Sequence, residues 1–333
     1  MIVTLTANPS LDRTVALNGT LVRGAVLRST GTTVDPGGKG INVARVLRRA
    51  GLEVVAVLPA DSGDPLLTAL DERAVPYVAV STSGPARNNI TIAEPDGTTT
   101  KLNEPGHTCT GRTLGELHTA VLNAACGASW AVLCGSLPPG IPDSWYADLV
   151  TALRSLGCRV AVDTSEAPLL ALADRLPAAA PDLIKPNSDE LAQLTGADAT
   201  ALEAGAAAGD LGPVIDAGHV LVQRGVGAVL ATLGAAGAVL VTGDGAWHAS
   251  TASATVRSTV GAGDSSLAGY LVAENAGHTP ADCLRHAVAY GSAAVALPGT
   301  ELPGPESVDP DAVRVTGFQD RPEPPAHALP SHP

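Results

Sequence analysis

The sequence contains few aromatic residues and few cations. Aromatic side chains make up 2 % of the 333 residues, so the core must be built from valine, leucine, isoleucine and alanine. A nucleic-acid surface that stacks bases on aromatic rings is therefore disfavoured. Basic residues number 20 against 33 acidic ones, and the net charge of −13 argues against nucleic acid or an anionic membrane as a partner. A few cations gathered at one site would still suffice for a small anionic ligand.

The chain also lacks paired cysteines and long apolar runs. Its five cysteines form no C-x-x-C pair and are odd in number, which argues against a zinc site or a disulfide framework and fits a reducing compartment. No segment approaches the roughly 18 uninterrupted apolar residues of a membrane span. The N-terminal MIVTLTANPSLD has no charged region of the kind that begins a signal peptide. We expect a cytoplasmic protein without a membrane partner.

Strand-like and helix-like segments alternate along most of the chain. Apolar runs typical of buried strands occur at residues 2–6, 54–58, 77–80, 130–133, 160–163 and 183–185. Helical spacing or helix-start signals fall between or after them, at 41–50, 64, 142–144, 165–166, 187–188, 263–275 and 280–297. Repeated units of a strand followed by a helix predict an α/β fold, with a mainly parallel sheet covered by helices on both faces.

Three stretches depart from this alternation. Residues 14–35 carry β-type residues without a helical period, and residues 89–103 are typical of a hairpin with Asp96 and Gly97 at its turn. The two stretches could pair as a small separate sheet, serving either as a lid over an active site or as a hairpin without function. From Ala228 onward the sequence predicts short antiparallel strands. We expect the Pro-rich residues 318–333 to be disordered, because they lack apolar periodicity.

The sequence VGAGDS, residues 260–265, stands just before a predicted helix. Because glycine has no Cβ, backbone N–H groups around Gly261, Ala262 and Gly263 can converge on one point, and the helix dipole adds positive charge there. The arrangement is typical of an anion hole for a transferring phosphoryl group, and Asp264 at its edge could take the proton of an attacking hydroxyl. The alternative is a glycine-rich turn in which Asp264 caps the helix.

The sequence PGGKGIN, residues 36–42, also enters a predicted helix. It is not a Walker A loop, because Gly40 stands where serine or threonine should follow Lys39. No G-x-G triplet in the chain continues as a dinucleotide fingerprint. A glycine turn at Gly38 and Gly40, with the cation of Lys39 and the amide of Asn42, suits a polyhydroxylated anionic ligand. The alternative is a tight turn with a solvated lysine.

The sequence KPNSDEL, residues 185–191, follows a predicted strand, where ligands of parallel sheets bind. Asn187 and Glu190 are three residues apart and can share one side of a helical turn. Their oxygen atoms suit Mg²⁺, which usually keeps several waters and needs few protein ligands. The alternative is a capping box, in which Asn187 caps the helix and Glu190 is its partner.

The sequence TLGAAGA, residues 232–238, predicts a turn between two strands. Thr232, Gly234 and Gly237 would allow the backbone to approach a nucleotide phosphate closely. The alternative is an ordinary hairpin.

These segments occur together and in order, and with them the sequence resembles the ribokinase-like (PfkB) family of sugar kinases from Met1 to about Gly317. The segments TANPSLDRTV, PGGKGINVARVL, GSLPPG, KPNSDEL and STVGAGDS look most like the phosphofructokinase and tagatose-6-phosphate kinase branch, and within it the kinases of fructose 1-phosphate. The resemblance implies a ribokinase-like three-layer αβα domain over residues 1–317, with a β-sheet lid formed by about residues 12–35 and 87–104. It also implies a homodimer that packs lid on lid.

The resemblance assigns roles to the matched positions. Asp264 falls on the catalytic base, and the anion hole falls on Gly261, Ala262 and Gly263. The sugar-binding positions are Asp12, Gly38, Lys39, Gly40 and Asn42. The nucleotide and magnesium positions are Lys185, Asn187, Glu190, Thr232, Gly234 and Gly237. Arg87 and Lys101 sit where this branch places cations against the phosphate of its substrate.

The implied reaction is transfer of the γ-phosphoryl group of ATP, with Mg²⁺, to D-fructose 1-phosphate. Relatives also ligate a monovalent cation such as K⁺ through backbone near Ser258, Val260, Ala294 and Gly299. Fructose 6-phosphate and tagatose 6-phosphate are alternative substrates, because one sequence does not show which end of the sugar the cations hold. A non-catalytic module that binds a sugar phosphate is an alternative of a different class. Retention of Asp264 and the anion-hole glycines favours the enzyme.

Overall fold

The main body of the protein is built on one large sheet. The computed structural model describes residues 1–82, 84–252 and 256–318, so the tail predicted to be disordered lies outside the described residues apart from Phe318. The sheet has ten strands, in the order β14 (Val313–Phe318), β13 (Gly245–Thr251), β12 (Ala238–Thr242), β11 (Ala228–Thr232), β10 (Leu183–Ile184), β9 (Arg159–Asp163), β8 (Trp130–Cys134), β1 (Ile2–Thr6), β4 (Val54–Pro59) and β5 (Tyr77–Val80). The strands from β11 to β5 are parallel, and β12, β13 and β14 are added antiparallel, as the sequence after Ala228 predicts.

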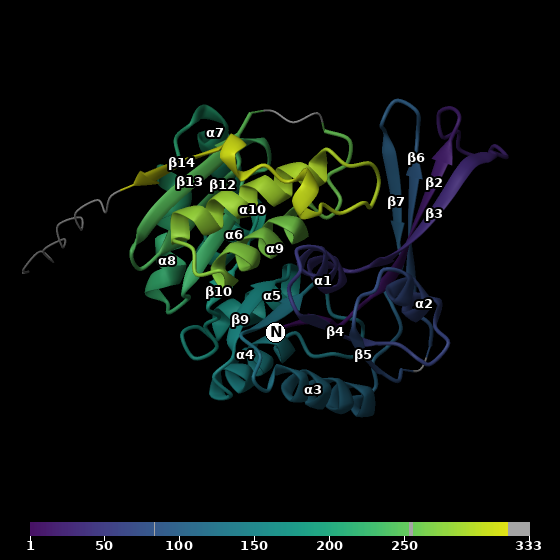
Figure 1. Cartoon of the computed structure of the whole chain (residues 1–333), viewed down its shortest axis with the longest axis horizontal. Helices are drawn as coiled ribbons and strands as arrows, with labels where there is room; N and C mark the ends of the chain where they lie inside the picture. The colour runs from purple at the N-terminus through teal and green to yellow at the C-terminus, as the bar shows by residue number, and fades with distance from the viewer. Residues whose placement is uncertain (83, 253–255, 319–333) are drawn as a thin grey trace, which may run out of the picture.

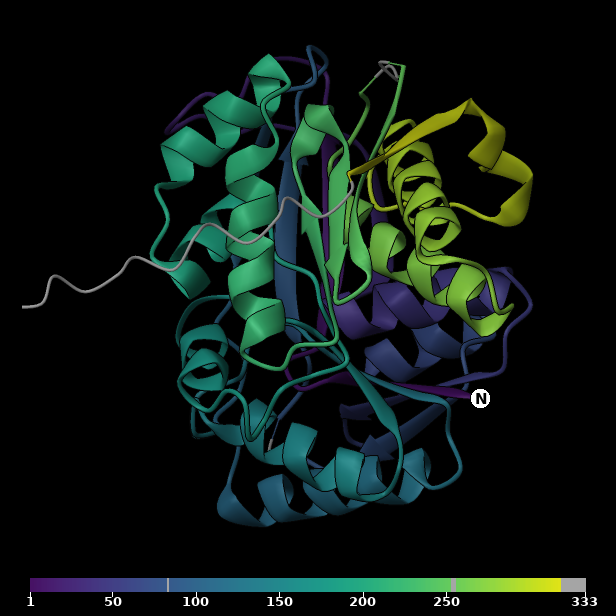
Figure 2. The same cartoon turned by 90° about the vertical axis from the view of Figure 1, so that its left-hand side faces the viewer.

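Helices cover both faces of this sheet (Figure 2). One core contains buried residues of α3 (Gly111–Ala125), α4 (Trp145–Ser155), α5 (Glu166–Asp174), α6 (Ser188–Thr195), α7 (Ala199–Ala208) and α8 (Gly212–Gln223). The other contains buried residues of α1 (Lys39–Arg49), α2 (Pro65–Glu72), α9 (Ala262–Asn275) and α10 (Pro280–Val295). Short 3₁₀ turns occur at η1 (Gly234–Ala236), η2 (Pro305–Ser307) and η3 (Pro310–Ala312). The predicted three-layer αβα architecture is therefore confirmed.

The first strand shows why its sequence forms a buried strand. Val3 and Leu5 belong to one core and Ile2 to the other, so successive side chains fill both faces. Such strands read as continuous apolar runs and not as alternating patterns. Among the described residues, no helix combines the length and the apolar character that crossing a membrane requires.

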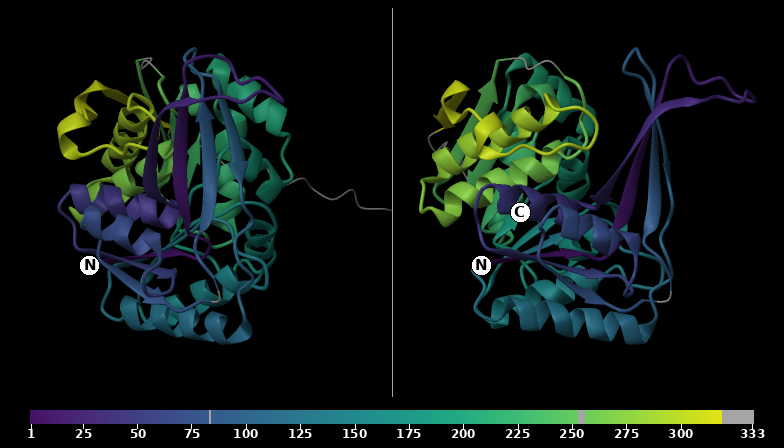
Figure 3. Two further views of the ribbon diagram at one scale, coloured as in Figure 1. Left: turned by 90° about the vertical axis from the view of Figure 1, so that its right-hand side faces the viewer. Right: turned by 45° about the vertical axis from the view of Figure 1, so that its right-hand side comes forward.

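A second sheet of four strands stands apart from the body, and we call it the lid sheet (Figure 1; Figure 3, right). Its order is β3 (Ser29–Gly37), β2 (Ser10–Leu17), β6 (Arg87–Ala93) and β7 (Thr99–Asn103). β2 pairs with β6, which confirms that the two non-helical stretches of the sequence form one separate sheet. Since β2 follows β1 and β6 follows β5, the lid sheet leaves the body from the carboxyl ends of parallel strands.

Candidate active site

Two lysines and a buried aspartate form the floor of the site at the carboxyl ends of the parallel strands. Asp163 ends β9, and its side chain is fully buried. Nζ of Lys39, at the start of α1, lies 2.8 Å from Oδ1 of Asp163, and Nζ of Lys185, just after β10, lies 3.1 Å from Oδ2. The arrangement brings two of the predicted site residues together around an aspartate that the sequence reasoning did not select.

The ion pairs around Asp163 shift the pKa values of Asp163 and Lys39. Burial would raise the pKa of Asp163, but the ammonium groups of Lys185 and Lys39 outweigh burial and hold that pKa below its ordinary value. Burial likewise lowers the pKa of Lys39, and the ion pair with Asp163 outweighs it, so the pKa of Lys39 is raised. The floor therefore carries a carboxylate between two ammonium groups, with one net positive charge available to an anionic ligand.

Asp264 lies in the first turn of α9 and faces the N-terminus of α1. It is buried, and its Oδ2 accepts a hydrogen bond of 2.9 Å from Nδ2 of Asn42. Burial, and next the charge of Asp163, raise the pKa of Asp264 to about 6, although Lys39 and the bond from Asn42 oppose the shift. A carboxylate with such a pKa is still mostly ionised at pH 7, and is a better proton acceptor than an exposed aspartate.

The start of α9 is open toward this carboxylate. The residue that caps the helix is Gly261, with φ of 74°, and no side chain caps the helix. Asp264 is therefore not the N-cap, and the alternative reading of this motif is wrong. The first-turn N–H groups of a helix have no intrahelical acceptors, although that of Ala262 donates to the Thr259 carbonyl at 3.5 Å. The predicted anion hole thus corresponds to the start of this helix, beside Asp264. Ala262 and Gly263 open the helix, and Gly263 packs against the ammonium group of Lys185.

A polar cluster at the base of the lid sheet holds Asp12. Its Oδ1 accepts hydrogen bonds from Ser10 Oγ at 2.7 Å and from Asn89 Nδ2 at 2.9 Å. A Cβ on Gly37 would lie 2.3 Å from the Asp12 carboxyl group, so only glycine fits beside it. Asp12 is thus fixed by β2 and β6, next to the turn at Gly38 and α1 that was predicted to bind the sugar.

The register of the lid sheet puts the predicted cations on the face that carries Asp12. Asp12 is opposite Asn89, and Thr91, two residues further along β6, is opposite Lys101. Arg87 precedes Asn89 by two residues, so it shares that face. The Arg87 guanidinium is half-buried and donates to the carbonyl of Glu104 at 2.9 Å, while its buried Nε has no partner among the described residues.

A large open cavity of about 810 Å³ lies on the Lys185 side of the floor formed by Lys39, Asp163 and Lys185, where Asn187 lines it. It lies in the size range typical of small-molecule sites. Its lining includes Asn187, Thr232 and Gly234, three of the predicted nucleotide residues. The predicted turn between two strands is confirmed as the 3₁₀ turn η1, and Gly237 follows it against the backbone of β13.

Glu190 and Asn187 form the capping box that was the alternative to a metal site. Glu190 Oε2 accepts from the Asn187 N–H at 2.9 Å, and Asn187 Oδ1 accepts from the Glu190 N–H at 2.8 Å. The cap uses Oε2 of Glu190 and leaves Oε1 with no hydrogen bond to the described residues. Within the described ranges, no group of three or more His, Cys, Asp or Glu side chains gathers as a metal site. One carboxylate fits a magnesium ion that keeps most of its waters.

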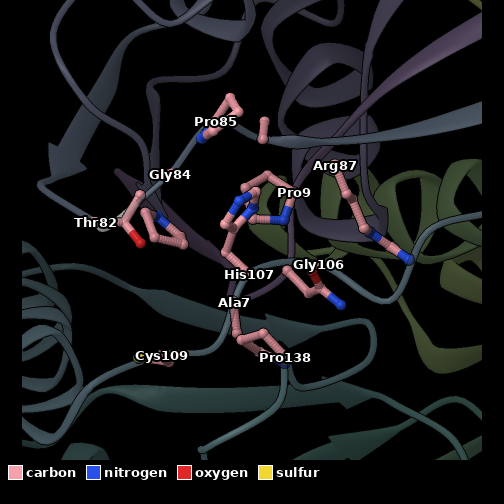
Figure 4. A pocket seen from close by; sticks show the side chains of 13 residues that line it. Ala7, Pro9, Thr82, Gly84, Pro85, Arg87, Gly106, His107, Cys109 and Pro138 are labelled. Atoms are coloured by element: carbon pink, nitrogen blue, oxygen red, sulfur yellow. The ribbon is translucent and has the colours of Figure 1, made fainter.

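A second, much smaller cavity lies where the lid sheet joins the body (Figure 4). Its volume of about 30 Å³ leaves space for one or two water molecules, not for a sugar. His107 packs against Gly84 here, and Asn8 Nδ2 donates to the carbonyl of Pro105 at 3.1 Å. These contacts lie where the lid sheet is attached to the body.

Sequence reasoning missed Asp163, Ser10 and Asn89. Asp163 could have been found, because an acidic residue ends a buried run at the carboxyl end of a parallel strand, where ligands bind. Ser10 and Asn89 carry no such signal, since only the parallel pairing of β2 with β6 brings them together.

Comparison of the chain with known proteins shows the family to which it is related. The profile described as pfkB family carbohydrate kinase matches residues 6–307. A 1-phosphofructokinase of Rhodobacter capsulatus is 36 % identical over 319 residues, which cover 95 % of this chain and 96 % of that protein. A 1-phosphofructokinase of Escherichia coli K12 is 33 % identical over 300 residues, with coverage of 88 % and 90 %.

Solved structures show the same architecture. The crystal structure of phosphofructokinase-2 from Escherichia coli with substrates and products has a TM-score of 0.83 and 29 % identity, and covers 92 % of this chain and 96 % of that one. Ribokinase from Thermotoga maritima has a TM-score of 0.70 at 19 % identity, with coverage of 92 % and 97 %, and at that identity the likeness concerns the fold alone. The predicted ribokinase-like fold is confirmed.

Proposed function

The chain belongs to the pfkB family of carbohydrate kinases, and from that premise we propose that it transfers the γ-phosphoryl group of ATP to D-fructose 1-phosphate. It is a sugar-phosphate kinase, and its relatives named 1-phosphofructokinase support this substrate. The products are D-fructose 1,6-bisphosphate and ADP.

One observation carries the proposal: Asp264 combines a raised pKa with a place beside an open helix N-terminus. The pKa of about 6 suits a group that accepts a proton at neutral pH. The N–H groups that follow Gly261, which no side chain caps, suit stabilisation of the negative charge on a phosphoryl group in the transition state of transfer. A binding module without catalysis would have no use for a basic carboxylate at that point.

In the proposed reaction the substrate O6 hydroxyl gives its proton to Asp264. O6 then forms a bond to the γ-phosphorus, and the bond from that phosphorus to the oxygen bridging it to the β-phosphorus breaks, releasing ADP. The N–H groups of residues 261–263 receive the equatorial oxygens. Phosphoryl transfer depends on positioning and charge neutralisation more than on covalent chemistry, so Lys39 and Lys185 contribute by charge.

Glu190, with Asn187 beside it, would hold the magnesium ion that accompanies ATP. When bound, this ion neutralises phosphate charge and helps to orient the β- and γ-phosphates. Thr232, Gly234 and Gly237 would border the nucleotide in the large cavity. No further metal ligand is needed from the chain if the ion keeps its waters.

A monovalent cation such as K⁺ is part of the proposal. Ser258 Oγ donates to the Gly299 carbonyl at 2.7 Å, and the N–H groups of residues 257 and 258 donate to the carbonyl of Val295, one residue after Ala294. The segments expected to ligate K⁺ are therefore neighbours. An Escherichia coli phosphofructokinase-2 has been crystallised in complex with potassium.

Arg87 and Lys101 would hold the phosphate that the substrate already carries. Both share the lid face with Asp12, which would bind sugar hydroxyls. An arginine can hold a phosphate through two donors, whereas a lysine acts as a point charge. In the proposal the segments 12–35 and 87–104 close over the substrate as a lid on the kinase unit of residues 1–317. Closure excludes water and suppresses hydrolysis of ATP.

The test is ADP release by the purified protein with Mg-ATP and, in turn, fructose 1-phosphate, fructose 6-phosphate, tagatose 6-phosphate and fructose. We expect kcat/KM for fructose 1-phosphate to exceed each of the others at least tenfold, about 1.4 kcal/mol in transition-state binding. Preference for a 6-phosphate would overturn the substrate and keep the reaction. Binding of a sugar phosphate without ADP release would favour the non-catalytic module.

We also propose a homodimer through the lid sheet. The face opposite Asp12 carries a row across the strands formed by Val34, Arg13, Ile90 and Leu102, in which Val34 and Leu102 are exposed. Packing two such faces would remove this apolar surface from water. An Escherichia coli phosphofructokinase-2 is described in a tetrameric inhibited form. Light scattering should give twice the chain mass, and Leu102→Lys should shift it to one chain; a wild-type monomer would refute the dimer.

A further inference from the structure

Asp35 lies at the base of the lid sheet, where β3 leaves the lid and enters the body. It is buried, although it belongs to a strand whose outer residues are exposed. It pairs in register with Asp12 and comes just before the turn that leads into α1. A buried carboxylate requires partners, because an unpaired buried charge is strongly unfavourable.

The partners of Asp35 come from three different elements. Its Oδ2 accepts a hydrogen bond of 2.7 Å from Oγ1 of Thr300, in the loop after α10. Its Oδ1 forms ion pairs with Arg45 of α1, at 3.4 Å, and with Arg73 after α2. Asp35 therefore joins β3 to α1, to the end of α2 and to a loop 265 residues away in the sequence.

The contact with Arg45 leads to the sugar side of the site. Arg45 also donates to the carbonyl of Pro36 at 3.2 Å, so it fixes the backbone that begins the turn of residues 36–42. It lies about one helical turn beyond Asn42, the residue that holds the Asp264 carboxylate.

The contact with Thr300 leads to the anion hole. Gly299, the residue before Thr300, accepts the hydrogen bond from Ser258 Oγ at 2.7 Å. Ser258 Oγ in turn accepts from the N–H of Val260 at 3.2 Å, directly before the N-terminus of α9. A continuous path of hydrogen bonds and covalent bonds thus runs from Asp35 to Val260, the residue directly before the anion hole.

We propose that Asp35 is a positioning residue that fixes the sugar-binding turn and the anion-hole turn relative to each other, through Arg45 on one side and Thr300 on the other. In-line transfer requires the attacking hydroxyl and the phosphoryl group to be aligned, and a small misplacement lowers the rate strongly. The inference rests on the proposed kinase function. It adds residues that touch neither substrate.

The test replaces Thr300 and not Asp35, because loss of Asp35 would leave Arg45 buried without its carboxylate and destabilise the fold. Thr300→Val removes the hydroxyl and keeps the branched shape, and Thr300→Ser keeps the hydroxyl. Thr119→Val on the remote helix α3, where Thr119 donates to the carbonyl of Gly115, is the matched control.

We expect Thr300→Val to lower kcat about tenfold, in keeping with loss of one hydrogen bond to a charged group, with KM for ATP within twofold of wild type. Thr300→Ser should restore kcat to within threefold, and Thr119→Val should leave it unchanged. Hydrogen exchange of residues 258–263 should accelerate in Thr300→Val and stay as in wild type in the other two variants.

Equal kcat and equal exchange in Thr300→Val and wild type would overturn the inference, as would a loss that Thr300→Ser does not restore. Failure of the kinase proposal looks different. In that case wild type releases no ADP with any of the sugars, whereas exchange at residues 258–263 still reports whether Thr300 controls that turn.

Discussion

Asn42 donates from Nδ2 to Oδ2 of Asp264 over 2.9 Å, although 222 residues separate them in the sequence. The bond joins the N-terminus of α1 to that of α9, and so connects the turn proposed to bind the sugar with the carboxylate proposed as the base. It favours the ionised form of Asp264 and partly offsets the effect of burial.

Asp264→Asn should lower kcat by about 10²–10⁴-fold, because the amide cannot accept the proton of O6. KM for ATP should change less than threefold, since the anion hole and the nucleotide cavity stay intact. A coupled assay of ADP release measures both constants, with the exposed Asp174→Asn as the control. Turnover near the wild-type value would remove Asp264 from the mechanism.

The pH dependence of kcat/KM should report the same group. Only the ionised carboxylate accepts a proton, and the pKa of Asp264 is about 6, so kcat/KM should fall tenfold per pH unit below that value. Above pH 7 this carboxylate should cause no further change. A profile that stays flat down to pH 5 would contradict the raised pKa.

The contribution of Asp264 to the stability of the fold should depend on pH in the opposite sense to its contribution to kcat/KM. Between pH 3.8 and about 6 the folded state keeps a proton on Asp264 that the unfolded chain has lost, so this group lowers stability as pH rises through that window. The shift corresponds to about 3 kcal/mol at pH 8, at most. Asp264→Asn should therefore unfold at higher urea concentration than wild type at pH 8, and the difference should shrink below pH 4. A variant less stable than wild type at pH 8 would speak against the burial penalty.

Asp163→Asn should destabilise the protein by about 3–5 kcal/mol, because it leaves the buried ammonium of Lys185 without its counter-charge. Urea denaturation at pH 7.5 measures the change. Asp148→Asn is the matched control, since its ion pair with Arg175 is about half exposed on both sides and should contribute less than about 1 kcal/mol. Equal losses in the free energy of unfolding for the two substitutions would mean that Asp163 does not stabilise the buried Lys185 ammonium.

Arg87→Met should raise KM for fructose 1-phosphate at least tenfold and leave KM for unphosphorylated fructose unchanged, because only the former loses a phosphate contact. Lys101→Met should act in the same direction with a smaller effect, since Lys101 is exposed. Arg112→Met, on the surface of α3, is the control. Equal losses with both sugars would assign Arg87 to the attachment of the lid sheet instead of the phosphate.

Much of the fold followed from local patterns. The runs at residues 2–6 and 160–163 became β1 and most of β9, and the start signal at Asn187 became the cap of α6. The helices α3, α7 and α8 and the strand β14 were not predicted. The helix α7 is rich in alanine and carries one large apolar residue, Leu202, so its periodic signal is weak.

Local sequence patterns predicted most of the strands and helices in their order along the chain, together with the glycine turns at residues 36–42 and 260–265. Side-chain periodicity and the conformational freedom of glycine are local properties that can be seen in a single segment. Tertiary packing alone places Asp163 between Lys39 and Lys185, brings Asn89 to Asp12, and brings Thr300 to Asp35. Those neighbours depend on which strand ends adjoin and how the layers pack, and no local spacing encodes that choice.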